Sequence, residues 1–242
     1  MKFNGSNIRI SPTATIGKNV RIGDGTVIYD HVTIGDNSTI ANDCVIGEPT
    51  ANYYSDDSHT NKPTFIGKNA LIRSHSIIYE DVIIGGHFQT GHRVTIREKT
   101  TIGNNCSMGT NCDLQGFLTI GNQCRFHSDV HVCQFSSIGN YVFIYPGVVL
   151  ANDKHPPTEN VKGPTIGSYT QIGIQSSIIG AITIGQNCLV GAASIVTKSF
   201  GHFSFLLGSP ALQKGDIRKM LDKNGNPRYP WKVRFKSGKP NR

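Results

Sequence analysis

Residues 102–150 read IGNNCSMGTNCDLQGFLTIGNQCRFHSDVHVCQFSSIGNYVFIYPGVVL. Every sixth residue of this stretch is large and apolar: Ile102, Met108, Leu114, Ile120, Phe126, Val132, Ile138, Ile144 and Leu150. Neither the period of an amphipathic helix nor that of a half-buried strand explains this spacing. A fixed hexapeptide repeat is typical of a parallel β-helix, in which each hexad forms one side of a coil and three hexads close one turn.

The same six-residue frame covers most of the chain. It extends backwards from Ile102 to Ile66, occurs separately from Ile10 to Ile46, and resumes from Ile166 to Val196. At 242 residues the chain is long enough for two ordinary domains, but the continuous repeat favours one. We therefore predict an all-β fold, a parallel β-helix over residues 1–200. A C-terminal helix, expected over residues 211–221, and a basic tail would complete residues 201–242.

The position of a residue within its hexad predicts the direction of its side chain. If the large apolar residue is position 1, positions 5 and 1 point inward, position 6 points outward, and positions 2 to 4 form a turn. Gly, Asn and Asp recur in these turns because they tolerate positive φ. Residues eighteen apart should then stack on successive coils, about 4.8 Å apart.

Five of the six cysteines occupy position 5, where a small inward-facing residue is needed: Cys44, Cys106, Cys112, Cys124 and Cys188. Cysteine behaves there as a small hydrophobe. Cys133 lies at position 2, and the sequence contains no C-x-x-C pair that would indicate zinc. We expect free thiols, a reducing compartment and no metal site.

Two stretches break the frame and must leave the coil. Ile46 and Ile66 are 20 residues apart, and Leu150 and Ile166 are 16 apart; neither number is a multiple of six. The external loops are therefore expected at about residues 48–64 and 152–164. Loops on a rigid scaffold are where function concentrates.

The net charge of +8 lies in the C-terminal segment. Residues 1–213 contain 14 Lys and Arg against 14 Asp and Glu, whereas residues 214–242 contain 10 against 2. The basic segment suits an anionic partner such as a phosphorylated cofactor, or is simply a solvated tail. Its aromatic residues (Tyr229, Trp231, Phe235) permit nucleic-acid binding, but no nucleic-acid motif is present, so we expect no such partner. Without a long apolar run or a signal peptide, we expect a cytoplasmic protein that is not inserted in a membrane.

At this point the chain resembles the left-handed β-helix acyltransferases. The resemblance rests on the Ile-Gly-x-x-small-x hexads, the His155-Pro excursion, the stretch Val190-Gly-Ala-Ala-Ser-Ile-Val-Thr-Lys198 and the following Gly208-Ser-Pro-Ala. It covers about residues 8–212. The resemblance implies a left-handed coil and a homotrimer that binds acetyl-CoA in the cleft between neighbouring subunits.

Three segments are most similar to sugar-nucleotide N-acetyltransferases of that family: residues 47–54 (GEPTANYY), 89–98 (QTGHRVTIRE) and 149–157 (VLANDKHPP). The resemblance implies acetylation of the amino group of a nucleotide-linked sugar, with dTDP-3-amino-3,6-dideoxyhexose as the expected acceptor, for cell-surface polysaccharide synthesis. O-acetylation of a sugar or small molecule on the same scaffold is the alternative.

Among nine histidines, the stacking of residues eighteen apart favours His131 as the proton acceptor for this reaction. His131 occupies an outward position 6, and Asp113 lies eighteen residues earlier, where its carboxylate can orient the imidazole. Gln134, eighteen residues before Asn152, supplies a second amide near the second loop. His127 lies in the preceding turn. An outward histidine on a solenoid is also commonly a surface or trimer-interface residue, so this alternative stays open.

Other family members suggest different bases. His155 aligns with the catalytic histidine of small-molecule O-acetyltransferases, although the preceding Asn-Asp-Lys departs from their pattern. In the lipid A type acyltransferases the catalytic histidine falls at position 134, where this chain has Gln134, which argues against a fatty-acyl transferase. A neutral substrate amine can also react without a protein base.

The remaining candidates are binding residues. For the acceptor we expect Arg93 and Arg97 at a diphosphate, with a solvated or interface salt-bridge role as the alternative. The other acceptor candidates, all near the loops or in the similar segments, are Tyr53, Tyr54, His92 and Asp153. Matching the family motif places Ala192, Thr197 and Lys198 at CoA, beside Gly173 and Gly191, which would keep the groove wall low. Lys214 and Arg218 are candidates for its 3′-phosphate.

Two other classes of function remain. A γ-type carbonic anhydrase shares this solenoid and binds zinc through three histidines; His87 and His92 have a suitable spacing, but the third ligand would fall at Ala51, where His59 is the nearest candidate. A non-catalytic scaffold that uses its basic tail would leave the two loops unexplained.

Overall fold

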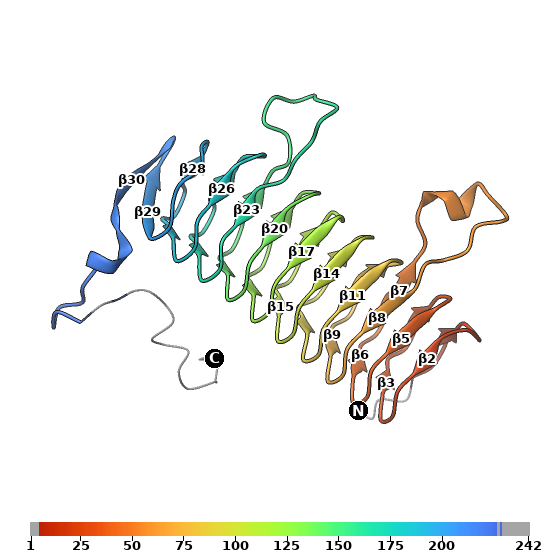
Figure 1. Ribbon diagram of the computed structural model, residues 1–242. Coiled ribbons are helices and arrows are strands. Elements are labelled where there is room, and N and C mark those ends of the chain that lie inside the picture. The colour runs from red at the N-terminus through yellow and green to blue at the C-terminus, as the bar shows by residue number, and fades with distance from the viewer. Residues whose placement is uncertain (1–4, 227, 229–242) are drawn as a thin grey trace.

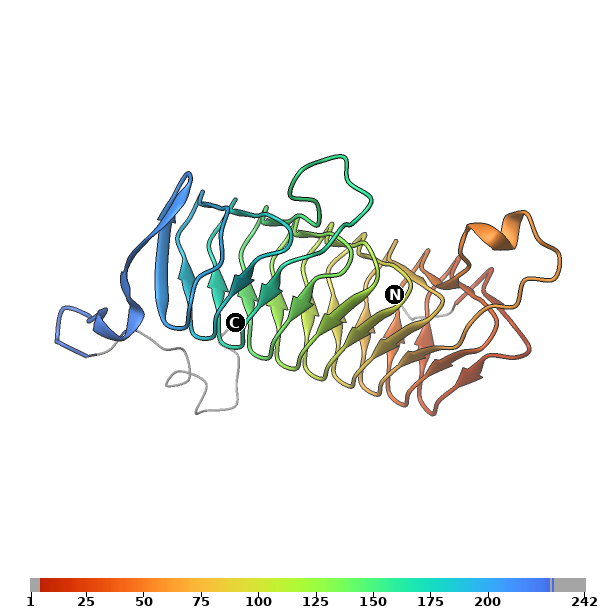
Figure 2. The same cartoon turned by 45° about the horizontal axis from the view of Figure 1, so that its top comes forward.

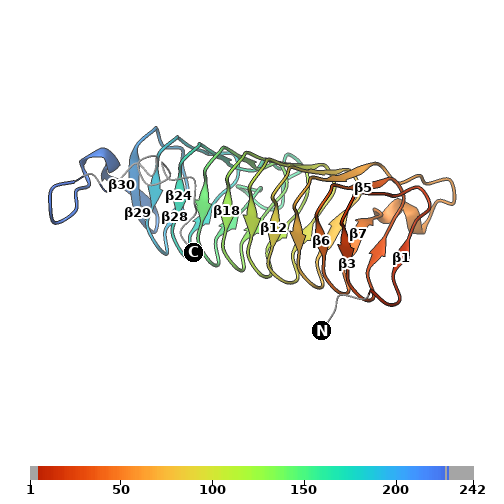
Figure 3. The ribbon, with the colours of Figure 1, turned by 90° about the horizontal axis from the view of Figure 1, so that it is seen from below.

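The computed structural model describes residues 5–226 and residue 228, and these form one β-solenoid (Figure 1). Its strands make three sheets of 10, 9 and 11 strands, here called sheets A, B and C. Within the described residues the strand pairs are parallel, apart from the antiparallel pair β29–β30. Figure 3 shows sheet C from outside, with β3, β6, β12, β18 and β24 side by side along the solenoid.

The strands are short, as a hexad requires. Sheet A contains β1 (Arg9–Ile10), β4 (Val27–Ile28), β7 (Val45–Glu48), β10 (Ile77–Tyr79), β13 (Thr95–Ile96), β16 (Asp113–Leu114), β19 (His131–Val132), β22 (Val149–Leu150), β25 (Ser177–Ile178) and β28 (Ile195–Val196). Sheet B contains β2 (Thr15–Ile16), β5 (Val32–Ile34), β8 (Thr64–Ile66), β11 (Val82–Ile84), β14 (Thr100–Ile102), β17 (Leu118–Ile120), β20 (Ser137–Ile138), β23 (Thr165–Ile166) and β26 (Thr183–Ile184). Sheet C contains β3 (Arg21–Ile22), β6 (Thr39–Ile40), β9 (Leu71–Ile72), β12 (Gln89–Thr90), β15 (Ser107–Met108), β18 (Arg125–Phe126), β21 (Phe143–Ile144), β24 (Gln171–Ile172), β27 (Leu189–Val190), β29 (Ser204–Gly208) and β30 (Ala211–Asp216).

Burial follows the position in the hexad, as the sequence predicts. In β14, Thr100 and Ile102 are buried and Thr101 between them is exposed. The five position-5 cysteines are buried, Cys133 is half-buried, and all six are free thiols. Position 4 of the turns has positive φ even where the residue is bulky, as at Phe117 (54°). The all-β parallel β-helix expected from the hexads is therefore confirmed.

The predicted stacking of residues eighteen apart is also confirmed. Asp113 in β16 pairs with His131 in β19, and His131 pairs in turn with Val149 in β22. The step from one strand to its neighbour in a sheet, here called a register step, is about 4.8 Å. The side chains of one column therefore lie on one outward face of the coil.

Two segments leave the coil, and both leave it at the same corner. Loop 1 (residues 49–63) connects β7 to β8 and contains the 3-10 helix η1 (Ala51–Tyr54), and loop 2 (residues 151–164) connects β22 to β23. Each loop departs from a sheet A strand and returns at a sheet B strand, so both project from the A/B corner, on the same side of the solenoid (Figures 1 and 2). Five register steps of sheet A separate them, or roughly 24 Å.

The helix expected over residues 211–221 is wrong. Residues 211–216 form strand β30, which folds back antiparallel on β29, and only Ile217–Lys219 make a turn of 3-10 helix, η2. The last coil leaves the backbone groups of β29 unpaired at the edge of sheet C, and β30 satisfies them. Ala211, 1% exposed, covers the end of the core. Tertiary pairing thus outweighs the local helical preference.

The aromatic residues of the basic tail, Tyr229, Trp231 and Phe235, lie outside the described residues. In the described part of the chain, no helix has the length and apolar character needed to cross a membrane.

Candidate active site

His131 and Asp113 meet on the outward face of sheet A. Nδ1 of His131 lies 3.1 Å from Oδ2 of Asp113, which is ion-pair distance. The two side chains are 35% and 39% exposed. Because Nδ1 faces the carboxylate, Nε2 is the ring nitrogen left for proton exchange with a substrate. The pair predicted from the sequence is therefore present with the geometry of an oriented base.

The surroundings of this pair show that it contributes little to the stability of the coil. The residues next to the pair in its column on sheet A are apolar or hydroxyl-bearing: Thr95 pairs with Asp113 on one side, and Val149 pairs with His131 on the other. A solvent-exposed ion pair contributes only about 0.2–1 kcal/mol to the free energy of unfolding. The coil would lose little stability if the pair were replaced by residues like its neighbours.

The residues expected around His131 lie close in the fold but differ in their contacts. Gln134 is half-buried in the turn after β19. The Asn152 carbonyl accepts a hydrogen bond from the Lys162 N–H at 2.7 Å, which closes the base of loop 2. His127 is exposed in the turn before β19, and its carbonyl accepts the Cys112 thiol.

In loop 2, the Asp153 carboxylate shapes the backbone. It accepts hydrogen bonds from the N–H groups of His155 (2.9 Å) and Thr158 (2.8 Å) and from the Thr158 hydroxyl (3.2 Å). Desolvation raises the pKa of Asp153, but these donors outweigh it and hold the pKa below its ordinary value. Asp153 thus orders the turn that carries the exposed His155. Its three hydrogen bonds form within the loop, without a bound substrate.

In loop 1, Tyr53 packs edge-on against three rings, those of Tyr29, Tyr54 and His59, at centroid distances of 6.2, 5.2 and 6.0 Å. The Tyr54 hydroxyl donates to the Glu48 carboxylate at 2.9 Å, and this bond raises the pKa of Tyr54 to about 12. Tyr54 nevertheless remains 67% exposed. Both rings help to fix loop 1, and Tyr54 also presents an accessible face.

Loop 1 has an anchor that sequence reasoning missed. Glu80 is 2% exposed and accepts the Thr50 N–H (3.1 Å), the Thr50 hydroxyl (2.8 Å) and the Lys62 N–H (2.6 Å). His59 Nε2 lies 3.3 Å from the same carboxylate. Burial raises the pKa of Glu80, but the hydrogen bonds outweigh burial and lower it overall. The sequence did not predict this contact between Glu80 and both ends of loop 1, because the loop lies outside the hexad frame.

The two arginines expected at a diphosphate lie at opposite ends of strand β13. Arg97, at the A/B corner, makes a two-pronged contact with Glu98 (3.0 Å for each nitrogen) and lies over the Tyr79 ring at 5.4 Å. Arg93, at the C/A corner, donates from Nε to the Asn111 side chain at 2.9 Å. His92 beside it is exposed, with its N–H donating to the Thr110 hydroxyl at 3.3 Å. The two guanidinium groups therefore do not form one clamp within a single chain.

The residues expected at CoA are distributed over the corners of the last coils. Gly173, Gly191 and Ala192 lie at the C/A corner, and Thr197 and Lys198 follow β28 at the A/B corner. A Cβ on Gly173 would approach the Ala192 nitrogen to 2.7 Å, and one on Gly191 would approach Leu207 to 2.5 Å. Backbone packing of the coil therefore requires Gly173, whereas at Gly191 the Leu207 side chain can move aside.

The three cations expected near CoA also differ. The Lys198 ammonium lies 5.7 Å from the Phe200 ring centroid. Arg218 is tied to Asp216, with Nε 3.0 Å from Oδ1, and lies over the Phe203 ring at 4.3 Å. Lys214 is exposed on β30. Arg218 thus has a structural partner, whereas the cation–π contact of Lys198 leaves its charge available for a phosphate.

The carbonic anhydrase alternative needs three histidines together. His87 lies at the B/C corner, 3.4 Å from the Asn69 side chain, His92 lies at the C/A corner, and His59 contacts Glu80. Among the described residues of this chain, no group of three potential metal ligands occurs.

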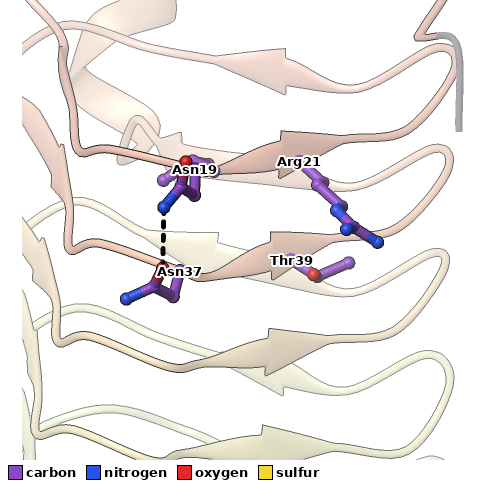
Figure 4. Close-up of a pocket in the computed structure, with 5 residues that line it drawn as sticks. Asn19, Arg21, Asn37 and Thr39 are labelled. Carbon is purple, nitrogen blue, oxygen red and sulfur yellow. Dashed lines mark hydrogen bonds between the residues drawn. The ribbon is translucent and has the colours of Figure 1, made fainter.

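A hollow of about 470 Å³ lies far from His131, at the N-terminal end of the coil (Figure 4). It is lined by Asn19, Val20, Arg21, Asn37 and Thr39. Asn19 donates to Asn37 at 3.1 Å, which links two successive coils. The lining includes no proton acceptor of the histidine or carboxylate type.

Comparison with known proteins agrees with this fold. Residues 13–48 match the family described as bacterial transferase hexapeptide (six repeats), and residues 165–201 match the hexapeptide repeat of succinyl-transferase. The structure of Arabidopsis UDP-N-acetylglucosamine acyltransferase is similar, with 15% identity and a TM-score of 0.70 over 87% of this chain and 73% of that one. Another UDP-N-acetylglucosamine acyltransferase has 23% identity and a TM-score of 0.55 over 90% of this chain and 79% of its own. Superposition preserves the hand of a coil, so these likenesses support the left-handed coil expected from the resemblance.

Proposed function

We propose that this protein is an acyl-CoA-dependent acyltransferase with His131 as general base. The observation that carries the proposal is the 3.1 Å contact between His131 and Asp113 on a face whose neighbouring residues are apolar or hydroxyl-bearing. The hexapeptide-repeat matches and the likeness in fold to acyltransferases support the reaction class. No other part of the described chain offers a histidine that is both outward on a sheet and paired with a carboxylate at hydrogen-bonding distance.

For the reaction we propose transfer of an acetyl group from acetyl-CoA to an amine. The nitrogen attacks the thioester carbonyl, a C–N bond forms, and the C–S bond breaks. His131 takes a proton from the attacking nitrogen and returns it to the departing sulfur, which gives an amide and a free thiol. Asp113 orients the ring and stabilises its cationic form, and general base catalysis of this kind contributes roughly 10²–10⁴-fold.

We propose the amino group of a nucleotide-linked amino-dideoxy sugar, such as dTDP-3-amino-3,6-dideoxyhexose, as the acceptor. The two loops flank the coils that carry His131 and Asp113, and Asn152 and Gln134 offer amides on the loop 2 side. Loop 2 is ordered by Asp153, so its polar groups are held in place before substrate binds.

We further propose a homotrimer in which each site combines two chains. His131 lies on an outward, partly exposed sheet face, and such a face does not by itself enclose a CoA-sized ligand. A neighbouring subunit would provide the second wall, with Lys198 and Thr197 at the donor. A sugar hydroxyl is the second candidate acceptor. A hydroxyl must lose its proton as it attacks, whereas a neutral amine is already nucleophilic, and the His131–Asp113 pair could act as the base that removes this proton.

The test is a panel assay in which release of the CoA thiol is measured. Acetyl-CoA and a long-chain acyl-CoA are each offered with amino-sugar nucleotides and with the matching hydroxy-sugar nucleotides. We expect acetyl transfer to an amino-sugar nucleotide, with a product 42 Da heavier, as one acetyl group replaces one hydrogen. Transfer only to hydroxyl acceptors would select the second candidate, and absence of thiol release with every pair would refute the proposal.

A further inference from the structure

Two phenylalanines stack on successive coils at the A/B corner. Phe117 and Phe135 both occupy position 4 of their turns, and their ring centroids are 5.0 Å apart at an interplanar angle of 48°. Lys99 occupies the same position one coil earlier, and its ammonium lies 4.5 Å from the Phe117 ring centroid. These three residues form a column, here called the cation–aromatic platform.

The platform contributes little to the core. Phe117 and Phe135 have φ of 54° and 64°, a conformation that is unfavourable for bulky side chains and that Asn or Asp fills in many other coils. Phe135 is 41% exposed. Position 4 has positive φ in most turns of this coil, so the exposed stacked rings, and not the backbone, distinguish this site.

The platform lies between the two loops and next to the candidate base. Phe135 follows His131 by four residues in the same coil. Loop 2 packs on its turn, since a Cβ on Gly163 would come within 2.5 Å of the Phe135 carbonyl carbon. Loop 1 approaches from the other side, because Lys62 contacts Asp81, which precedes Lys99 in the column, at 3.5 Å.

We infer that the cation–aromatic platform binds the nucleoside diphosphate of the acceptor, and this inference rests on the proposed function. An exposed ring offers a stacking surface for a nucleobase, and an exposed ammonium beside it suits a diphosphate. Lys99 fits this role better than Arg97, whose guanidinium already contacts Glu98. The acyl donor also carries a nucleoside diphosphate. We assign the platform to the acceptor because it lies between the loops, three register steps from the coil of Lys198, or roughly 14 Å.

Direct binding tests the inference without reference to catalysis. Titration calorimetry with dTDP and with UDP would be performed on the full chain and on Phe135→Leu, Phe135→Tyr and Lys99→Ala. We expect Phe135→Leu to raise the Kd of at least one of the two nucleotides by about tenfold, the effect of one lost stacking contact, and Phe135→Tyr to retain binding. Phe65→Leu is the matched control, because Phe65 is 45% exposed on sheet B, away from the platform.

The arms of the experiment separate this inference from its alternatives. The Kd of CoA should not change in Phe135→Leu; a loss of CoA affinity instead of dTDP and UDP affinity would assign the platform to the donor and overturn the inference. Unchanged Kd values for dTDP and UDP in both Phe135→Leu and Lys99→Ala would also overturn it, as would dissociation of an oligomer in Phe135→Leu, which would make the platform a subunit contact. His131→Ala should bind dTDP and UDP like the wild type, so failure of the proposed base leaves this result unaffected.

Discussion

Nδ1 of His131 lies 3.1 Å from Oδ2 of Asp113, one register step away on sheet A. The contact joins an imidazole to a carboxylate at a place where the fold requires neither. Both side chains are more than a third exposed, so solvent screens the pair and its contribution to stability is small. Our proposal therefore assigns this pair a chemical role, in which the two residues should act as one unit in catalysis.

Asp113→Asn keeps the shape of the side chain but removes its charge. We expect kcat to fall by less than in His131→Ala, because the imidazole remains while its orientation and cationic form are less stabilised. The double variant should resemble His131→Ala, since residues that act together are not additive. Steady-state kinetics on the three variants checks this, and the melting temperature of Asp113→Asn should stay near the wild-type value. Independent, multiplicative losses in kcat would argue against a paired role.

Lys198→Ala should raise the KM for acetyl-CoA and leave the KM for the acceptor unchanged. The substitution removes a charge expected near a phosphate, a loss of about 1–3 kcal/mol in donor binding. Steady-state kinetics with each substrate varied in turn measures both constants. Lys18→Ala, which changes an exposed lysine in an N-terminal turn, is the control. An unchanged KM for acetyl-CoA in Lys198→Ala would remove Lys198 from the donor site.

Glu80→Gln should destabilise loop 1 near neutral pH. The carboxylate is buried and accepts three hydrogen bonds, so loss of its charge costs about 1–3 kcal/mol. The pKa of Glu80 is lowered below 4.5, the ordinary glutamate value, so this stabilisation is fully present above pH 4.5 and disappears as the pH falls through the folded-state pKa. Denaturant unfolding of both proteins at several pH values measures the difference. A difference that grows as the pH falls would contradict the assignment.

Thiol labelling should distinguish Cys133 from the other cysteines. Burial raises the pKa of Cys44 and of Cys112 to about 11, and their sulfurs lie inside the coil. Burial also raises the pKa of Cys133, but this residue is only half-buried. We expect iodoacetamide to modify Cys133 first in the native protein, followed by mass spectrometry of the peptides. First modification of Cys44 or Cys112 would show that the coil opens more readily than its packing indicates.

The hexad frame predicted the parts of the structure that obey it. Inward Cys106, outward His131 and the contact of His131 with Asp113 follow from position in the repeat, because the coils are flat and each turn takes eighteen residues. In such a regular coil, the number of residues between two positions determines the distance between them. The position of the candidate base therefore follows from the sequence.

The hexad frame does not predict the structure of the segments that lie outside the repeat. Beyond Val196 the pairing of β30 with the edge of sheet C depends on what the coil leaves unpaired, which local preference does not encode. In loop 1, Glu80 binds residues 30 and 18 positions away, because the loop folds back by its own route. Arg97 and Glu98, adjacent in sequence, pair with each other instead of offering the arginine to a ligand. The stack of Phe117 and Phe135 was predictable in register, but its ring geometry was not.

The most direct test of the account is the rate of CoA thiol release by wild type and by His131→Ala, at saturating acetyl-CoA and acceptor. We expect acetyl transfer by the wild type and a kcat lower by roughly 10²-fold or more in His131→Ala, in the range of general base catalysis. The variant should keep the melting temperature and the nucleotide affinity of the wild type. A folded His131→Ala protein with near-wild-type kcat would show that His131 is not the general base. The substrate amine would then react without a protein base or another residue would accept its proton, and His155 would be the next residue to test.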